Sequence, residues 1–242
     1  MTLPVTRYIA AILEEFDALA QAAARDLSVH VPSCPDWTAA DLVYHVGDVY
    51  WSWRAVVEGR RTESSTGEFA PRPPDAGLVA WAGEEAQLLA HILANTEPHT
   101  HVWTWAPQKD VAFVQRRMAQ ETTVHRIDAE LAAGFRRPIP PDLAADGIDE
   151  FLEFFLPDEP ASLAGPGESV HLHATDSGDE WLVTVRDGTV TTEREHAKGD
   201  VAVRGAVSDL LLLLWRRVPA DDLEILGDRA ALDRFLSRTS LT

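Results

Sequence analysis

Residues 117–130 have the sequence RMAQETTVHRIDAE and lie within a longer run, residues 111–133, that contains no proline or glycine. Gly134 follows this run, and the pattern predicts a helix that ends at the glycine. Glu121 and His125 are four residues apart and therefore lie on one face of this helix, about one turn from each other. Apolar residues one and two turns earlier extend the same stripe, which indicates that the face points into a core. A carboxylate and an imidazole in this arrangement can bind one metal ion.

The residues before this run predict further helices. Apolar periodicity indicates helices over residues 5–27, 38–58 and 76–95. Two prolines within residues 31–37 predict a loop, because proline lacks a backbone N–H and disfavours helix. We therefore expect an all-helical N-terminal domain that covers residues 1–138.

The chain changes character after a proline-rich linker at residues 135–141, in which three of four consecutive residues are proline. Beyond this linker, the sequence predicts a mixture of helices and short strands. The expected elements are helices at 142–156, 208–217 and 229–237 and strands at 169–175, 180–185, 190–195 and 201–203. They predict a second, smaller domain of the α+β type that covers residues 139–242.

Composition and charge restrict the partners and the location. The 242 residues include 39 acidic and 21 basic side chains, and the net charge of −18 disfavours binding to nucleic acid or to an anionic membrane surface. Cys34 is the single cysteine, which excludes an internal disulfide and a cysteine-rich zinc site. No apolar run approaches the ~20 residues of a membrane-spanning helix, and the N-terminus shows no secretory signal pattern. We expect a cytoplasmic protein that is a monomer or a homodimer.

A second histidine, His45, lies in the predicted second helix with apolar residues on its own face. With Glu121 and His125 it supplies two imidazoles and one carboxylate, the donor set of a catalytic zinc site with one open position. Iron and nickel also suit this donor set. Asp128, one turn after His125, and Asp48, close to His45, are candidates to hold the second ring N–H of each imidazole. Spacing alone does not bring His45 to the other two, and each side chain can equally be a hydrogen-bonded core residue.

Two motifs in the helical part resemble the signatures of a known family. Residues 31–38, VPSCPDWT, followed by residues 41–47, DLVYHVG, resemble the opening of the mycothiol-dependent maleylpyruvate isomerase family, and residues 117–130 resemble its second signature. Residues 205–236 are similar to the second domain of that family. The resemblance implies a DinB-like four-helix bundle followed by a smaller, sterol-carrier-like α+β domain.

The same resemblance implies a cofactor and a set of site residues. The zinc ligands of the family correspond to His45, Glu121 and His125, and its thiol co-substrate is mycothiol. Relatives often have Trp-Gly-Arg at residues 215–217, where this chain has two arginines after the tryptophan. Arg217 then corresponds to an arginine that can hold a substrate carboxylate and take part in catalysis.

Together these features predict a zinc-dependent enzyme that uses a low-molecular-weight thiol. It would be a mycothiol S-transferase or a mycothiol-dependent isomerase, in which zinc or another divalent metal activates the thiol for attack on a small electrophile. Two alternatives remain open. One is a non-catalytic zinc-containing module that binds a small molecule or a regulatory partner, and the other is a hydrolase that uses metal-bound hydroxide.

The sequence also gives predictions for three residues outside the candidate metal site. His171 and His173 alternate on a predicted strand and lie on one face, where they can bind a metal, but the sequence favours a solvent-facing pair. Cys34, which prolines flank closely, is expected to be a small buried packing residue.

Overall fold

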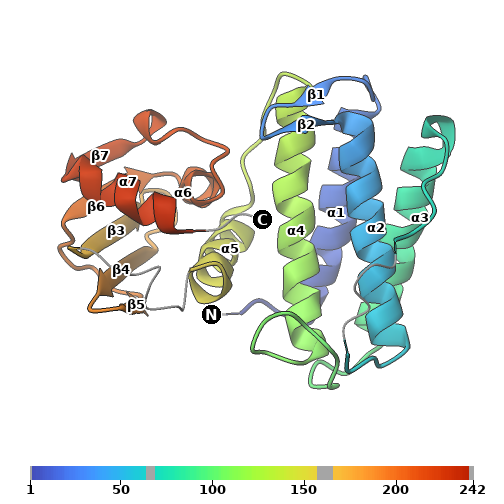
Figure 1. Cartoon of the computed structure of the whole chain (residues 1–242), viewed down its shortest axis with the longest axis horizontal. Helices are drawn as coiled ribbons and strands as arrows, with labels where there is room; N and C mark the ends of the chain where they lie inside the picture. The colour runs from blue at the N-terminus through green and yellow to red at the C-terminus, as the bar shows by residue number, and fades with distance from the viewer. Residues whose placement is uncertain (1, 64–68, 157–165, 240–242) are drawn as a thin grey trace. The chain divides into compact units, whose positions relative to one another are not determined.

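The computed structural model of the chain describes residues 2–63, 69–156 and 166–239 (Figure 1). Internal contacts divide the chain into two compact units, residues 2–137 and residues 138–242. The first unit is mainly helical and also contains one short strand pair, and the second combines helices with a five-stranded sheet. The predicted fold class, a helical bundle followed by a smaller α+β domain, is therefore confirmed.

Four long helices form the N-terminal unit. They are α1 (Val5–Ala23), α2 (Ala39–Glu58), α3 (Asp75–Ala94) and α4 (Val111–Ala132). The α1 helix packs along α3 and α4, and α2 also packs along α3 and α4, so the helices surround one core (Figure 1). Ile12, Leu42, Leu89 and Met118, one from each helix, are almost completely buried in that core.

A short strand pair replaces much of the loop that the sequence predicts at residues 31–37. The strands are β1 (His30–Val31) and β2 (Cys34–Thr38), and they run antiparallel. The prediction was wrong because a two-stranded pair has free edges, where the missing N–H of proline costs little. The pair leads directly into α2, where Thr38 and Asp41 form a capping box. Hydrogen bonds from Thr38 help to lower the pKa of Asp41 to about 2.

A buried ion-pair network joins α4 to α1. Arg126 donates to Glu15 Oε2 at 2.7 Å and to Glu130 Oε2 at 2.9 Å, and Arg137 donates to Glu130 Oε1 at 2.7 Å. The side chain of Glu130 is fully buried and that of Arg126 is only 3% exposed. Because an unpaired charge at this depth is costly, the network holds the C-terminal half of α4 in place, where His125 also lies.

The C-terminal unit contains a five-stranded sheet in the order β5-β4-β3-β6-β7. The strands are β3 (Glu168–Ala174), β4 (Glu180–Arg186), β5 (Thr189–Glu193), β6 (Val201–Gly205) and β7 (Glu224–Gly227). Neighbours run antiparallel except β3 and β6, which are parallel. The helices are α5 (Pro141–Phe154), α6 (Val207–Leu214) and α7 (Arg229–Arg238), with a 3₁₀ turn, η1, at Ala220–Asp222.

The two faces of β3 differ in chemistry. The helices α6 and α7 pack against β3 and β6, and Val170 and Leu172 are fully buried. His171 and His173 alternate with these residues and therefore point to the opposite face of the sheet. The sequence did not predict β7, because four residues are too few to show alternation. Among the described residues, none of the helices is both long and apolar enough to cross a membrane.

Candidate metal centre

Three side chains from two helices converge inside the N-terminal bundle. His45 Nε2 lies 3.3 Å from Glu121 Oε1, and His125 Nε2 lies 3.1 Å from the same oxygen. The donor atoms of all three residues lie within 4.8 Å of one another. The structure therefore brings His45 from α2 to the pair on α4, which spacing alone could not do.

Local structure explains how each of these side chains is held. The capping box fixes the start of α2, and His45 follows in the second turn of that helix. At the start of α4, Asp110 Oδ1 accepts the N–H of Phe113 at 3.2 Å. Glu121 and His125 then lie one turn apart on the same face of α4, as the sequence predicts.

A buried carboxylate orients one of the imidazoles. His125 Nδ1 lies 2.9 Å from Asp128 Oδ2, as the sequence predicts, and Ser33 Oγ donates to Asp128 Oδ1 at 2.5 Å. Since Asp128 is fully buried, it keeps Nδ1 of His125 occupied and leaves Nε2 facing Glu121. Asp48 differs from the expected role beside His45, because its Oδ1 accepts the backbone N–H of Ala70 at 2.7 Å.

One side of the centre is open and has an aromatic wall. The side chain of His45 is 32% exposed, compared with 22% for Glu121 and 11% for His125. The ring of Trp37, on β2, lies 4.8 Å from the ring of His45 and 6.5 Å from that of His125 between centroids. A small molecule can therefore approach the donor atoms beside an indole surface.

The charges at the centre are strongly coupled. Arg117 Nη2 donates to Glu121 Oε2 at 3.2 Å. Burial opposes ionisation of Glu121, but the charge and hydrogen bond of His125 and the hydrogen bond of His45 hold the pKa of Glu121 well below its usual value. Burial also disfavours a charged His125, yet Glu121 and Asp128 together raise the pKa of His125 to about 9. Before a metal binds, the centre is thus an ionised carboxylate beside a protonated imidazole.

The donor set fits a divalent metal ion. Two imidazole nitrogens and one carboxylate oxygen make a three-ligand set of the kind that leaves a position free for water or a substrate. The second nitrogen of His125 is hydrogen-bonded to a carboxylate, an arrangement that is typical of histidines that bind metals. The residues present therefore match the group that the family resemblance implies.

The other residues that the sequence analysis selected lie elsewhere. Arg217 follows α6 in the C-terminal unit, and its Nη1 donates to the backbone oxygen of Trp215 at 2.8 Å. Its neighbour Arg216 has a φ of 61°, in the left-handed region that favours glycine. Cys34 is only partly buried, so the expectation of a buried packing residue was wrong.

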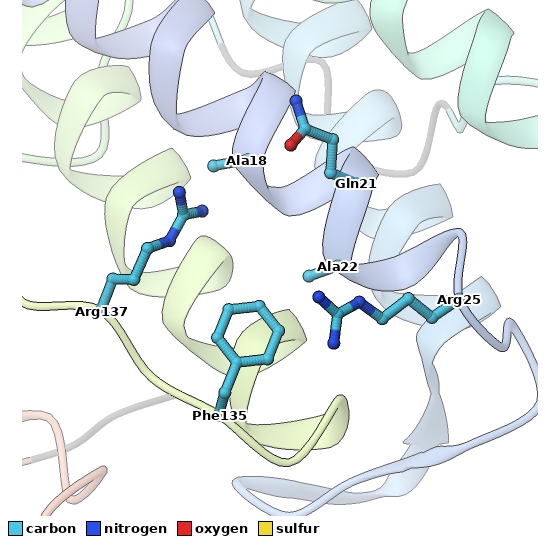
Figure 2. Close-up of a pocket in the computed structure, with 6 residues that line it drawn as sticks. All are labelled: Ala18, Gln21, Ala22, Arg25, Phe135 and Arg137. Atoms are coloured by element: carbon cyan, nitrogen blue, oxygen red, sulfur yellow. The ribbon is translucent and has the colours of Figure 1, made fainter.

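A separate pocket of about 270 Å³ lies on the N-terminal unit (Figure 2). Its lining residues are Ala18, Gln21, Ala22, Arg25, Phe135 and Arg137. Arg25 lies 4.5 Å from the centroid of the Phe135 ring, and Arg137 pairs with Glu130. The residues that line this pocket include neither a histidine nor a carboxylate, so the pocket itself offers no metal-binding donor set.

Comparisons with known proteins agree with this architecture. A crystal structure of the mycothiol-dependent maleylpyruvate isomerase matches with a TM-score of 0.65 and 14% identity, over 93% of this chain and 95% of that one. A histidine-to-alanine variant of that isomerase matches with a TM-score of 0.65 and 13% identity over the same shares. No curated protein is significantly similar in sequence. The family models of the mycothiol maleylpyruvate isomerase N-terminal domain and the MDMPI C-terminal domain match residues 9–130 and 142–234. The chain therefore belongs to the mycothiol maleylpyruvate isomerase family.

Proposed function

We propose that this protein is a metal-dependent enzyme that activates a low-molecular-weight thiol for attack on a small electrophile. The convergence of His45, Glu121 and His125, with one side open to solvent, is the observation that carries this proposal. Zinc is the ion that this donor set suits best, and iron and nickel are the other candidates. Family membership and the fold shared with a mycothiol-dependent isomerase favour mycothiol as the thiol.

The role proposed for the metal is to increase the small fraction of a thiol that is ionised at neutral pH. A free thiol with a pKa of about 8.5 is only ~3% thiolate at pH 7. When bound, zinc would favour the ionised form of a coordinating thiol and so raise the thiolate population by up to about 30-fold. The thiolate would then be able to attack an electrophilic carbon. In an isomerase this addition is followed by bond rotation and elimination of the thiol, whereas a transferase releases the adduct.

The protein's own residues prepare the site for this step. Asp128 accepts the Nδ1 proton of His125, so that Nε2 would offer its lone pair once a metal ion displaces the proton there. Arg117 donates to Oε2 of Glu121 and so orients that carboxylate, whose other oxygen, Oε1, faces the two histidines. Trp37 supplies an apolar wall beside His45, against which a substrate can pack. Positioning of the two reactants can contribute ~7–11 kcal/mol, more than deprotonation alone.

We further propose that Arg217 binds a carboxylate of the electrophile, since a guanidinium can hold a carboxylate through two parallel hydrogen bonds. Arg217→Lys keeps the charge and removes the bidentate geometry, so we expect a raised KM and an unchanged metal content. We place the activity in the cytoplasm, where such thiols are kept reduced.

X-ray absorption of the zinc-loaded protein tests the proposal. Addition of mycothiol should bring a sulfur neighbour to about 2.3 Å from the zinc, and His45→Ala should lose both this signal and turnover. Full metal binding and turnover in His45→Ala would refute the site. Thiol binding without turnover would instead support the non-catalytic module, and turnover with water alone would support the hydrolase.

A further inference from the structure

Four side chains outside the bundle form a second group of metal-binding donors. His171, His173, Glu180 and His196, here called the sheet histidine cluster, each supply one donor atom, and these atoms lie within 4.8 Å of one another. All four belong to the C-terminal unit. The sequence suggested a solvent-facing pair, but His171 is buried, with only 6% of its surface exposed.

The sheet itself assembles three of the four ligands. His171 and His173 are two residues apart on β3 and therefore share one face. Glu180, at the start of β4, pairs directly with His173 in the antiparallel register, which places it diagonal to His171. His196 comes from the segment between β5 and β6 and closes the group from outside the sheet.

All three imidazoles converge on one oxygen atom. Glu180 Oε2 lies 2.7 Å from His171 Nε2, 3.3 Å from His173 Nδ1 and 2.6 Å from His196 Nδ1. A carboxylate oxygen has about two lone pairs to share, so three ring nitrogens exceed what hydrogen bonding alone accommodates well. Four ligands that surround a zinc ion at 2.0–2.2 Å would be separated by about 3.3–3.6 Å. The three ring nitrogens lie 2.6–3.3 Å from Glu180 Oε2, and all four donor atoms lie within 4.8 Å of one another, so small outward shifts would admit an ion.

The rings also point at the shared oxygen from different directions. The interplanar angles are 82° between His171 and His173, 87° between His171 and His196, and 76° between His173 and His196. The rings therefore meet edge to face and do not stack, which leaves space between their nitrogen atoms.

We propose that the sheet histidine cluster binds one divalent transition-metal ion, best zinc, as a structural centre. Three imidazoles and one carboxylate suit zinc and its neighbours in the first transition series, and the absence of thiolates from the cluster disfavours copper(I). Four protein ligands fill a tetrahedral shell, as in structural sites, whereas the candidate centre in the bundle has three and an open position. The ion would fasten the segment that carries His196 to the start of β4.

Zinc counting in the full chain tests this proposal. Metal-depleted protein is loaded with zinc, desalted and analysed for bound metal. We expect two equivalents in the wild type, one in His45→Ala and one in His196→Ala. His196 is the informative position because its side chain is 79% exposed, so its removal should leave the fold intact. His99→Ala, which removes a histidine that is 95% exposed and outside both groups, should retain two equivalents.

The outcomes separate this proposal from the proposed function. The sheet site is supported if His45→Ala keeps one equivalent of zinc and if the added change His196→Ala or Glu180→Gln lowers the affinity for that zinc by about tenfold or more. This result does not depend on whether the bundle binds a metal. If His45→Ala binds no zinc, or if Glu180→Gln and His196→Ala bind as much zinc as the wild type, the proposal is overturned. Histidine NMR signals supply a second measurement, since zinc added to His45→Ala should shift those of His171, His173 and His196.

Discussion

Two replacements of Asp128 distinguish its two effects at the candidate metal centre: it orients the ring of His125, and it supplies a negative charge. The carboxylate is fully buried and has two partners, His125 Nδ1 at 2.9 Å and Ser33 Oγ at 2.5 Å. In Asp128→Asn the amide oxygen can still accept the His125 N–H, while the amide nitrogen donates to the Ser33 hydroxyl, which can act as an acceptor. This variant therefore keeps the ring orientation and removes only the negative charge. Asp128→Ala removes both.

Partners of this kind are worth about 10–100-fold in metal affinity, which corresponds to about 1.4–2.7 kcal/mol. We expect Asp128→Asn to lie near the lower limit and Asp128→Ala near the upper one. Zinc affinity is measured by competition with a chelator in the His196→Ala background, so that the sheet histidine cluster contributes little. Ser33→Ala is the matched control, because it leaves the contact between Asp128 and His125 intact, and it should lose less affinity than Asp128→Asn.

The metal-free protein provides a second measurement of the same contact. Asp128 is one of the groups that raise the pKa of His125 to about 9, so Asp128→Asn should move this pKa down toward its ordinary value near 6.5. NMR titration of the His125 ring records the shift. Zinc affinity within twofold of the wild type in Asp128→Ala, or an unchanged His125 titration in Asp128→Asn, would refute the role assigned to this carboxylate.

Three further predictions concern the stability of the bundle. Arg126→Met should lower the free energy of unfolding in urea by about 3–5 kcal/mol, because it leaves two buried carboxylates without their shared partner; a loss below ~1 kcal/mol would contradict this. Gly47→Ala places a methyl group 2.4 Å from an indole carbon and should destabilise, since overpacking costs ~1–3 kcal/mol, whereas Gly77→Ala meets nothing within 4 Å and should stabilise by up to ~1 kcal/mol. Equal effects of these two changes would exclude the steric explanation. Asp41→Asn should lower the melting temperature at pH 7, and the difference from the wild type should disappear as pH falls from about 4 to about 2, because the hydrogen bonds of Thr38 stabilise only the ionised carboxylate. A difference that persists at pH 2 would contradict this.

The helices could be predicted because their signals are local. Gly134 follows α4, and Thr38 with Asp41 marks the start of α2, so the apolar stripe and the cap agreed at each of these positions. The strand pair β1–β2 and the strand β7 were missed because short strands have little periodicity and are stabilised by a partner that is distant in sequence. The fold class depended on the long elements and was therefore predictable.

The two groups of histidines also differ in how far they could be predicted from the sequence. Glu121, His125 and Asp128 lie within two turns of one helix, and their spacing placed them on neighbouring positions of one face, where they can contact one another. The sheet histidine cluster offered only the alternation of His171 and His173. Glu180 joins them through the pairing of β3 with β4, and neither the register nor the path of the segment that carries His196 can be obtained from spacing.

Arg216 departs from the family pattern that the sequence resembles, and its backbone conformation and contacts indicate its role. The left-handed φ of 61° at Arg216 is a conformation that favours glycine, since a side chain there costs ~1–2 kcal/mol. The guanidinium offsets part of this cost by donating to the backbone oxygens of Leu214 and Leu236, which ties the end of α6 to α7. Arg216 therefore serves the fold, and the carboxylate-binding role proposed for this corner of the C-terminal unit falls to Arg217, whose neighbouring backbone Arg216 holds in place.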